Sequence, residues 1–300
     1  MTVSARDFDR ANAIYGNDIA SIRGKSTKPV SAIADPSEAR TAEPQAQALH
    51  IDIMFVEGLP FLNGVALPLD LTLVYELKNF DGDKTSRTAP VVQLGLESFR
   101  SALRSNGFSV SLIRCDGEKA LAKLTPLLNI VKIEVDVCGA ASHIPVVEQR
   151  IRVVKERIRA HMTGHLPYAL PKLALGLLVI YCATRLNYMP SSRQDRMSPR
   201  EALTGRKPHS KDFRCSFGEY VQAVVPNTDN SMHARTDDCI VMLPTGNRTG
   251  SVKMLSLLTG QIVTRDHFTI LPIPVSVIRK LNDAKGWTTQ QNRRPHTATQ

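Results

Sequence analysis

The sequence lacks the features that mark zinc-binding, secreted and membrane-spanning proteins. Its five cysteines are far apart, and no CxxC motif or clustered His/Cys spacing occurs, which argues against a zinc site and favours the reduced, buried thiols of an intracellular protein. The first residues contain no apolar segment typical of a secretory signal. The longest apolar stretch, residues 173–184, is flanked by Lys172 and Arg185. It is too short to span a bilayer, so it predicts a buried helix and no membrane partner.

Acidic residues are scarce relative to basic ones. The 300 residues contain 28 Asp and Glu against 38 Lys and Arg, which gives a net charge of +10. This balance favours a polyanionic partner, because each neutralised phosphate releases counterions. A basic protein without such a partner is the other interpretation. At 42% hydrophobic residues the chain has enough apolar surface for a sizeable core, and its length suggests one or two domains.

The pattern along the chain predicts an α/β core between two polar ends. Residues 1–48 contain few large apolar side chains, so we expect a flexible arm with one short helix near residues 7–14. Residues 49–205 alternate between strand and helix periodicity, which indicates a mixed sheet with helices on its faces. The expected strands are 51–56, 61–68, 71–77, 108–116 and 130–137, and the expected helices are 91–105, 119–128, 145–161 and 167–186.

The remaining residues predict a second, smaller unit. Short strand-like runs separated by turn residues indicate an all-β module over residues 206–275. The expected strands of this module are 220–225, 239–243, 252–256, 261–264 and 268–271. We expect residues 276–300 to form a polar tail.

Three carboxylates are the candidate catalytic residues. Asp52 lies in an apolar strand-like run, Asp116 ends another such run, and Glu148 opens a basic amphipathic helix. Two acids on strands and one at a helix start can hold a pair of divalent cations, and two-metal sites catalyse in-line displacement at phosphodiesters. We therefore expect the three carboxylates to converge within the width of a metal cluster. Glu118 and Glu156 are the substitutes if one of them is misassigned.

Each acid also has an ordinary structural interpretation on its own. Asp52 fits a polar, outward position of a strand, and Asp116 fits a turn or helix-cap aspartate. Glu148 fits a solvated helix face supported by i,i+4 pairs. On that helix, an apolar stripe should pack on the sheet, and three cations are rotated by about 100° from it, given 3.6 residues per turn. The stripe is Val147, Ile151, Val154 and Ile158, and the cations are Arg152, Lys155 and Arg159.

Several segments together resemble the integrase core of copia-type retrotransposon polyproteins, within the retroviral-integrase-like branch of the ribonuclease-H-like superfamily. The resemblance covers roughly residues 13–272. The segments that carry it are 13–25, Asp52-Ile53-Met54-Phe55, Arg114-Cys115-Asp116-Gly117-Glu118, Pro145-Val146-Val147-Glu148-Gln149-Arg150, 198–208 and Phe217-Gly218-Glu219-Tyr220-Val221.

The resemblance implies a ribonuclease-H-like core followed by a small β module. It maps a catalytic, metal-binding triad onto Asp52, Asp116 and Glu148, with Mg²⁺ or Mn²⁺ as a two-metal cofactor. The implied activity is 3′-end processing and strand transfer of element DNA into target DNA. The expected partners are DNA and further copies of the chain, and the expected place of action is the nucleus. Arg152, Lys155 and Arg159 would contact phosphates.

Two departures from the family pattern keep other functions open. Only 31 residues separate Asp116 from Glu148, fewer than the family usually has, and the upstream zinc-binding His/Cys cluster is absent from this sequence. The first alternative is a catalytically inactive, nucleic-acid-binding remnant of a retrotransposon polyprotein. The second is a structural or interaction module unrelated to nucleic acid.

Overall fold

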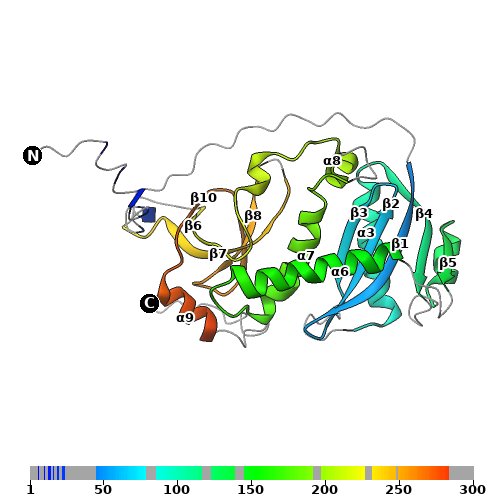
Figure 1. Cartoon of the computed structure of the whole chain (residues 1–300), viewed down its shortest axis with the longest axis horizontal. Coiled ribbons are helices and arrows are strands. Elements are labelled where there is room, and N and C mark those ends of the chain that lie inside the picture. Colours follow the sequence, from blue (N-terminus) through cyan, green and yellow to red (C-terminus); the bar gives the residue numbers. More distant parts are fainter. Residues whose placement is uncertain are drawn as a thin grey trace, which may run out of the picture.

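Two five-stranded sheets form the molecule, with two long helices between them (Figure 1). The computed structural model describes residues 45–78, 86–116, 123–138, 145–191, 197–226, 232–247 and 249–283, with single positions between residues 6 and 23. The predicted helix near residues 7–14 and most of the predicted arm lie outside these ranges.

The first sheet has the strand order β3-β2-β1-β4-β5. β1, β2 and β3 form an antiparallel meander, whereas β4 and β5 continue the sheet in parallel to β1. A helix precedes each of these two parallel strands along the chain. This is a ribonuclease-H-like mixed sheet, as the sequence predicted. Its strands are β1 (Gln45–Val56), β2 (Leu59–Leu67), β3 (Leu71–Glu76), β4 (Phe108–Asp116) and β5 (Glu134–Cys138).

Helices cover both faces of this sheet. The residues of one face pack with α3 (Ala89–Arg104) and α5 (Thr125–Ile130), where Leu49, Ile51 and Phe99 share a core. The other face packs with α6 (Pro145–Ala160) and α7 (Lys172–Leu186). Because side chains alternate along a strand, Asp52 lies on the α6 face together with Met54.

The register of β1 and β2 follows from a two-residue turn. Glu57 and Gly58 have φ angles of 47° and 79°, as a type I′ hairpin turn requires, and only glycine adopts such angles without strain. The expected strands 51–56 and 61–68 left four residues, 57–60, for this connection, whereas the observed turn has two. The observed turn pairs Val56 with Leu59 and therefore Asp52 with Asn63.

The second sheet is wholly antiparallel and has the order β10-β6-β7-β8-β9. It matches the predicted all-β module. Its strands are β6 (Tyr220–Val224), β7 (Thr236–Pro244), β8 (Val252–Ser256), β9 (Ile262–Arg265) and β10 (Phe268–Ile270). The short helices α8 (Pro199–Thr204) and η3 (Ser210–Phe213) lie between α7 and β6 along the chain.

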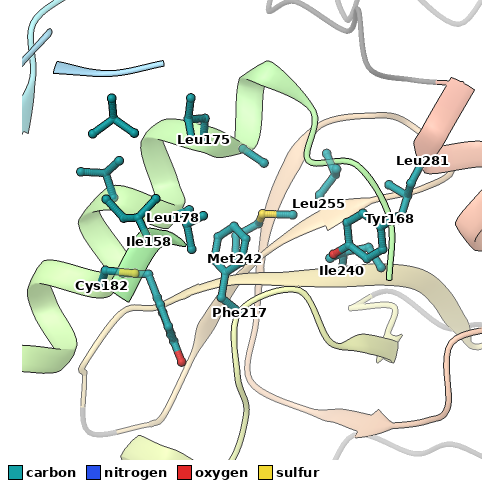
Figure 2. Packing of buried hydrophobic residues seen from close by; sticks show 14 of the residues in the cluster. Ile158, Tyr168, Leu175, Leu178, Cys182, Phe217, Ile240, Met242, Leu255 and Leu281 are labelled. Carbon is teal, nitrogen blue, oxygen red and sulfur yellow. The ribbon is translucent and has the colours of Figure 1, made fainter. Parts of the chain in front are cut away.

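One hydrophobic cluster joins the two sheets through α6 and α7. Figure 2 shows Ile158 of α6 and Leu178 and Cys182 of α7 beside two residues of the second unit. These two are Met242 of β7 and Phe217, which precedes β6. The predicted buried helix at residues 173–184 is confirmed, because Leu178 and Val179 are fully buried in this cluster. The described cysteines 115, 182, 215 and 239 are all buried free thiols. No helix in the described ranges is long and apolar enough to cross a bilayer.

The described residues near the N-terminal end differ from the expected boundaries in detail. β1 begins at Gln45 rather than after residue 48, because its buried Gln47 side chain accepts a hydrogen bond from the amide of Leu69 at 3.1 Å. Ile19 and Ile22 of the predicted loose arm pack against the central cluster. Arg23 donates two hydrogen bonds to the Asp238 carboxylate, at 2.8 and 2.7 Å.

The predicted polar tail from residue 276 begins instead with a helix. α9 (Val275–Asp283) buries Val277 and Leu281. These residues are four positions apart, so they share one helical face and pack into the central cluster. Polar residues around them obscure this short apolar stripe in the sequence.

Candidate active site

Asp52 and Asp116 occupy neighbouring positions on two adjacent parallel strands. Ile51 of β1 pairs with Cys115 of β4, so the next residue along each strand is one of the two aspartates. β4 ends at Asp116. The carboxyl ends of parallel strands are where open α/β sheets bind their ligands. The sheet therefore brings together two acids that are far apart in the sequence.

Glu148 reaches the same region from the first turn of α6. Val147 and Val154 of the predicted stripe are buried on the sheet face, as are Ile158 and, in part, Ile151. Glu148 itself is exposed. A carboxylate in the first turn interacts favourably with the positive end of the helix dipole. The packing of the stripe thus fixes which side of α6 carries the acid.

A polar network holds this end of α6 on the sheet. Arg150 donates to the Asp70 carboxylate and to the Thr72 hydroxyl, each at 2.6 Å. Asn187, at the end of α7, bonds both the amide and the carbonyl of Thr72 at 2.8 Å. Ser191 donates to the second oxygen of Asp70 at 2.8 Å. Both helices are therefore tied to the start of β3, which limits how far Glu148 can move.

The electrostatic environment of Asp52 shows that the three acids interact. Burial raises the pKa of the Asp52 carboxyl above its usual range; the amide of Ile53, which donates to it at 2.7 Å, acts in the opposite direction. The carboxylates of Asp116 and Glu148 raise this pKa further, and the ammonium group of Lys155 lowers it. The other two predicted acids and one predicted cation thus act on the Asp52 carboxyl group.

Of the two substitute acids, Glu156 lies in the described part of the chain, and it does not displace this set. Glu118 lies outside the described residues. Glu156 is exposed, and its carboxylate lies 3.8 Å from the guanidinium of Arg152, one helical turn away. Glu156 is not among the charges that shift the pKa of Asp52. Of the two acids on α6, Glu148 is the one that interacts with Asp52.

The three predicted cations of α6 do not share one environment. Arg152 and Arg159 are exposed, whereas Lys155 is half-buried and close enough to Asp52 to lower its pKa. Lys155 therefore belongs to the carboxylate site. The other two remain candidates for contacts to phosphates, which the structure of the free chain does not test.

Sequence reasoning missed Asn63, which lies directly opposite Asp52 on β2. Its side chain is fully buried, and neither amide atom has a hydrogen-bond partner in the described part of the chain. Leaving such a group unsatisfied costs about 1–3 kcal/mol. Side chains directly opposite across antiparallel strands lie about 5 Å apart, so the amide is within reach of the carboxylate. Counting outward from the Glu57-Gly58 turn would have revealed the pairing.

The three carboxylates suit a hard divalent cation in chemistry and charge. They offer only oxygen ligands, which Mg²⁺ prefers, and a bound cation would relieve the repulsion that raises the pKa of Asp52. Within the described ranges, no three His, Cys, Asp or Glu side chains already stand in a metal-holding arrangement. The acids are thus gathered in one region without forming a preassembled ligand cage.

The strand order and the helices define a ribonuclease-H-like core with an appended β module. No protein-family model and no curated protein matches the sequence. Among solved structures, the catalytic core domain of BIV integrase matches at 14% identity and a TM-score of 0.39, over 52% of this chain and 92% of that one.

A second solved structure matches over more of the chain. It is the simian T-cell lymphotropic virus intasome in complex with PP2A regulatory subunit B56 gamma, at 12% identity and a TM-score of 0.41, over 89% of this chain and 91% of that one. Likenesses this distant do not bear on activity. The functional argument therefore rests on the residues themselves.

Proposed function

We propose that this chain is a metal-dependent polynucleotidyl transferase of the copia-type integrase kind. It would process the 3′ ends of element DNA and join them to target DNA in the nucleus, as a homo-oligomer. Asp52, Asp116 and Glu148 would hold Mg²⁺ or Mn²⁺. The observation that carries the proposal is the register that places Asp52 and Asp116 side by side on β1 and β4, with Glu148 of α6 acting on the same carboxyl group of Asp52.

That observation is informative because the residues were chosen from the sequence alone. Asp52 and Asp116 come from two strands, and Glu148 and Lys155 come from a helix. An acid whose pKa is raised by burial and by neighbouring carboxylates, as that of Asp52 is, disfavours folding at neutral pH, and such clusters concentrate at functional sites. The motifs around them, Arg114-Cys115-Asp116-Gly117-Glu118 above all, support the copia-type assignment.

The reaction is a substitution at phosphorus. A 3′-hydroxyl oxygen of one DNA end forms a bond to a target phosphorus as the bond from that phosphorus to its own 3′ oxygen breaks. The attacking hydroxyl loses a proton, and the departing 3′ oxygen gains one. A divalent cation pair supplies charge stabilisation for the attacking and leaving oxygens. Asp52, Asp116 and Glu148 would position it, and Lys155 would contact the negatively charged phosphate.

A strand-transfer assay tests the proposal. Purified chain is mixed with a labelled DNA duplex and supercoiled plasmid, in Mn²⁺, Mg²⁺ or EDTA. We expect metal-dependent joining of label to plasmid, lost in Glu148→Gln. The matched control is Glu156→Gln, which removes the same charge from an exposed position on the same helix. Equal losses in both variants would show that the triad is misassigned.

The short interval of 31 residues between Asp116 and Glu148 favours one other function, a DNA-binding remnant. Such a remnant would keep the fold and the basic charge without catalysis. It predicts salt-dependent binding of the duplex and no joining in either metal. A chain that neither joins nor binds DNA would leave the structural-module interpretation.

A further inference from the structure

The opposite end of α6 carries a cluster of basic groups. The helix continues directly into a π-helical turn, η1 (His161–His165). Such turns are rare in proteins, and many of those that occur lie at functional sites. The ring centroids of His161 and His165 lie 5.1 Å apart. The ring centroids of His161 and Tyr181 lie 5.5 Å apart, in a T-shaped arrangement. Arg157 lies one turn earlier on α6.

Two adjoining cavities open at this cluster, between the core and the second sheet. One has a volume of about 400 Å³ and reaches Arg157 and Arg185. The other, of about 520 Å³, reaches Phe217 and Glu219. Both are lined by His161, His165 and Ser216. Volumes of this size are those of small-ligand sites.

The charge of these walls is strongly one-sided. Among the residues that the structure describes, no carboxylate forms an ion pair with Arg157, Arg185 or either histidine. The ionisable groups that face the cavities are Arg157 from α6, His161 and His165 from η1, Tyr181, Cys182 and Arg185 from α7, and Glu219 and Tyr220 beyond them.

Two of these groups are already engaged within the protein. Glu219, the acid on these walls, accepts a hydrogen bond from the amide of Ser216 at 2.9 Å. Arg185 donates to the carbonyl of Cys215 at 2.9 Å and lies 5.0 Å from the Tyr181 ring centroid. Arg185 therefore acts as a fixed positive charge behind the cavity.

His161 shows what the cluster lacks. Its Nδ1 atom is buried and has no hydrogen-bond partner in the described part of the chain. Burial lowers the pKa of the imidazole, and the neighbouring charges of His165, Arg157 and Arg185 lower it further. An anion in the adjoining cavities would relieve this repulsion.

We propose that the cavity lined by Arg157, His161 and His165 is a phosphate-binding site, and that the phosphate belongs to a nucleic-acid strand. Arginine and protonated histidine form the strong, charge-assisted hydrogen bonds that bind phosphate oxygens. Nucleic acid as the source rests on the proposed function; the anion site itself does not.

The position of the site suits a strand that also reaches the carboxylates. His161 lies thirteen residues beyond Glu148, about 20 Å along the helix axis at 1.5 Å per residue. Arg152 and Arg159 are exposed between them. A strand lying along α6 would thus meet positive charge from the carboxylate site to the second sheet.

An inorganic phosphate titration tests the anion site. The imidazole NMR signals of the full chain are followed at constant pH. We expect saturable shifts of His161 and His165, because both rings line the cavity together with Arg157. Arg157→Gln should weaken binding at least tenfold, whereas Arg104→Gln, in the exposed last turn of α3, should leave it unchanged. Shifts that do not saturate, or equal effects of the two variants, overturn the proposal.

A second arm distinguishes the source of the phosphate. Anisotropy of a labelled single-stranded oligonucleotide is measured for wild type, His161→Gln with Arg157→Gln, and the exposed control His233→Gln, after circular dichroism confirms folding. We expect the double variant alone to lose at least fivefold in affinity. Phosphate binding with unchanged oligonucleotide affinity would assign the site to free phosphate and overturn the nucleic-acid source. Catalytic failure alone would leave the phosphate titration unaffected, so the two proposals fail separately.

Discussion

The two ends of α6 carry opposite charge clusters. At its start, Glu148 joins Asp52 and Asp116, and burial together with like charge raises the pKa of Asp52. At its end, Arg157 joins His161 and His165, and burial together with like charge lowers the pKa of His161. In both places the fold brings together charges that repel each other. Such an arrangement disfavours the free protein and favours a ligand of the opposite sign.

The two ends also differ in packing. The start of α6 is held by the hydrogen bonds of Arg150 to Asp70 and Thr72, whereas the end opens into cavities of about 400 and 520 Å³. A catalytic site needs ligands held in place, because small displacements are costly in rate. A site that only binds a phosphate tolerates less tightly packed surroundings. The difference therefore fits chemistry at one end and binding at the other.

The largest expected effect comes from removing one carboxylate at the start of α6. Asp116→Asn should reduce metal-dependent strand transfer by several orders of magnitude, because the amide keeps the shape but loses the charge that holds the cation. DNA binding should change little. The measurement is the strand-transfer assay beside anisotropy on the same duplex, with Asp136→Asn on neighbouring β5 as control. Unchanged transfer in Asp116→Asn would remove this residue from the site.

The next effect concerns how the acidic end is held. Arg150→Met should destabilise the chain by about 2–3 kcal/mol, because the Asp70 carboxylate stays largely buried without its cation. Arg114→Met breaks an ion pair with Asp136 whose side chains are 47% and 45% exposed, so it should cost under about 1 kcal/mol. Urea unfolding of both variants gives the comparison. Equal losses would contradict the role of the network.

A smaller effect concerns the surface between the two ends. Replacing Arg152, Lys155 and Arg159 together by Ala should flatten the salt dependence of duplex binding by about 2–3 units of log–log slope, near one per lost phosphate contact. The control is Arg104→Ala, which removes a cation from the last turn of α3 on the opposite face. A slope that stays the same in the triple variant would exclude this face from the contact surface.

The smallest expected effects concern how stability depends on pH, and they have opposite signs at the two ends of α6. The raised pKa of Asp52 means that the folded chain binds this proton more readily than the unfolded one, so stability falls as pH rises above 3.8. The lowered pKa of His161 means that the folded chain binds this proton less readily than the unfolded one, so stability is lost as pH falls below 6.5.

Two variants separate these contributions. Asp52→Asn should be more stable than wild type at neutral pH, with the difference vanishing in acid. His161→Gln should lose less stability than wild type between neutral pH and pH 5. Unfolding free energies measured across pH, with Asp136→Asn and His233→Gln as controls, give both slopes. Slopes of the same sign would contradict the opposition between the two ends.

The sequence predicted those parts that depend on local patterns. Alternation and helical periodicity located most strands and helices, and the apolar stripe from Val147 to Ile158 correctly oriented α6. The interaction of Asp52 with Asp116 and Glu148 followed from recognising motifs. What was missed depends on pairing across the fold. Asn63 becomes a neighbour of Asp52 only through a turn placed at Glu57-Gly58.

The basic end of α6 was missed for a similar reason. His161 and His165 lie in polar sequence that resembles a helix end, and Arg185 joins them only when α7 folds back along α6. Likewise, Leu281 looked like part of a polar tail because a stripe of two residues is too short to identify. Contacts between distant segments decide all three cases, and spacing within one segment does not encode them.

The most direct test of the account is a calorimetric titration of Mn²⁺ into the free chain. The central claim is that Asp52, Asp116 and Glu148 together hold a divalent cation. Wild type and Glu156→Gln should bind Mn²⁺ saturably and alike, whereas Asp52→Asn, Asp116→Asn and Glu148→Gln should each weaken binding at least tenfold. Equal binding in all five proteins, or no saturable binding in wild type, would contradict the claim.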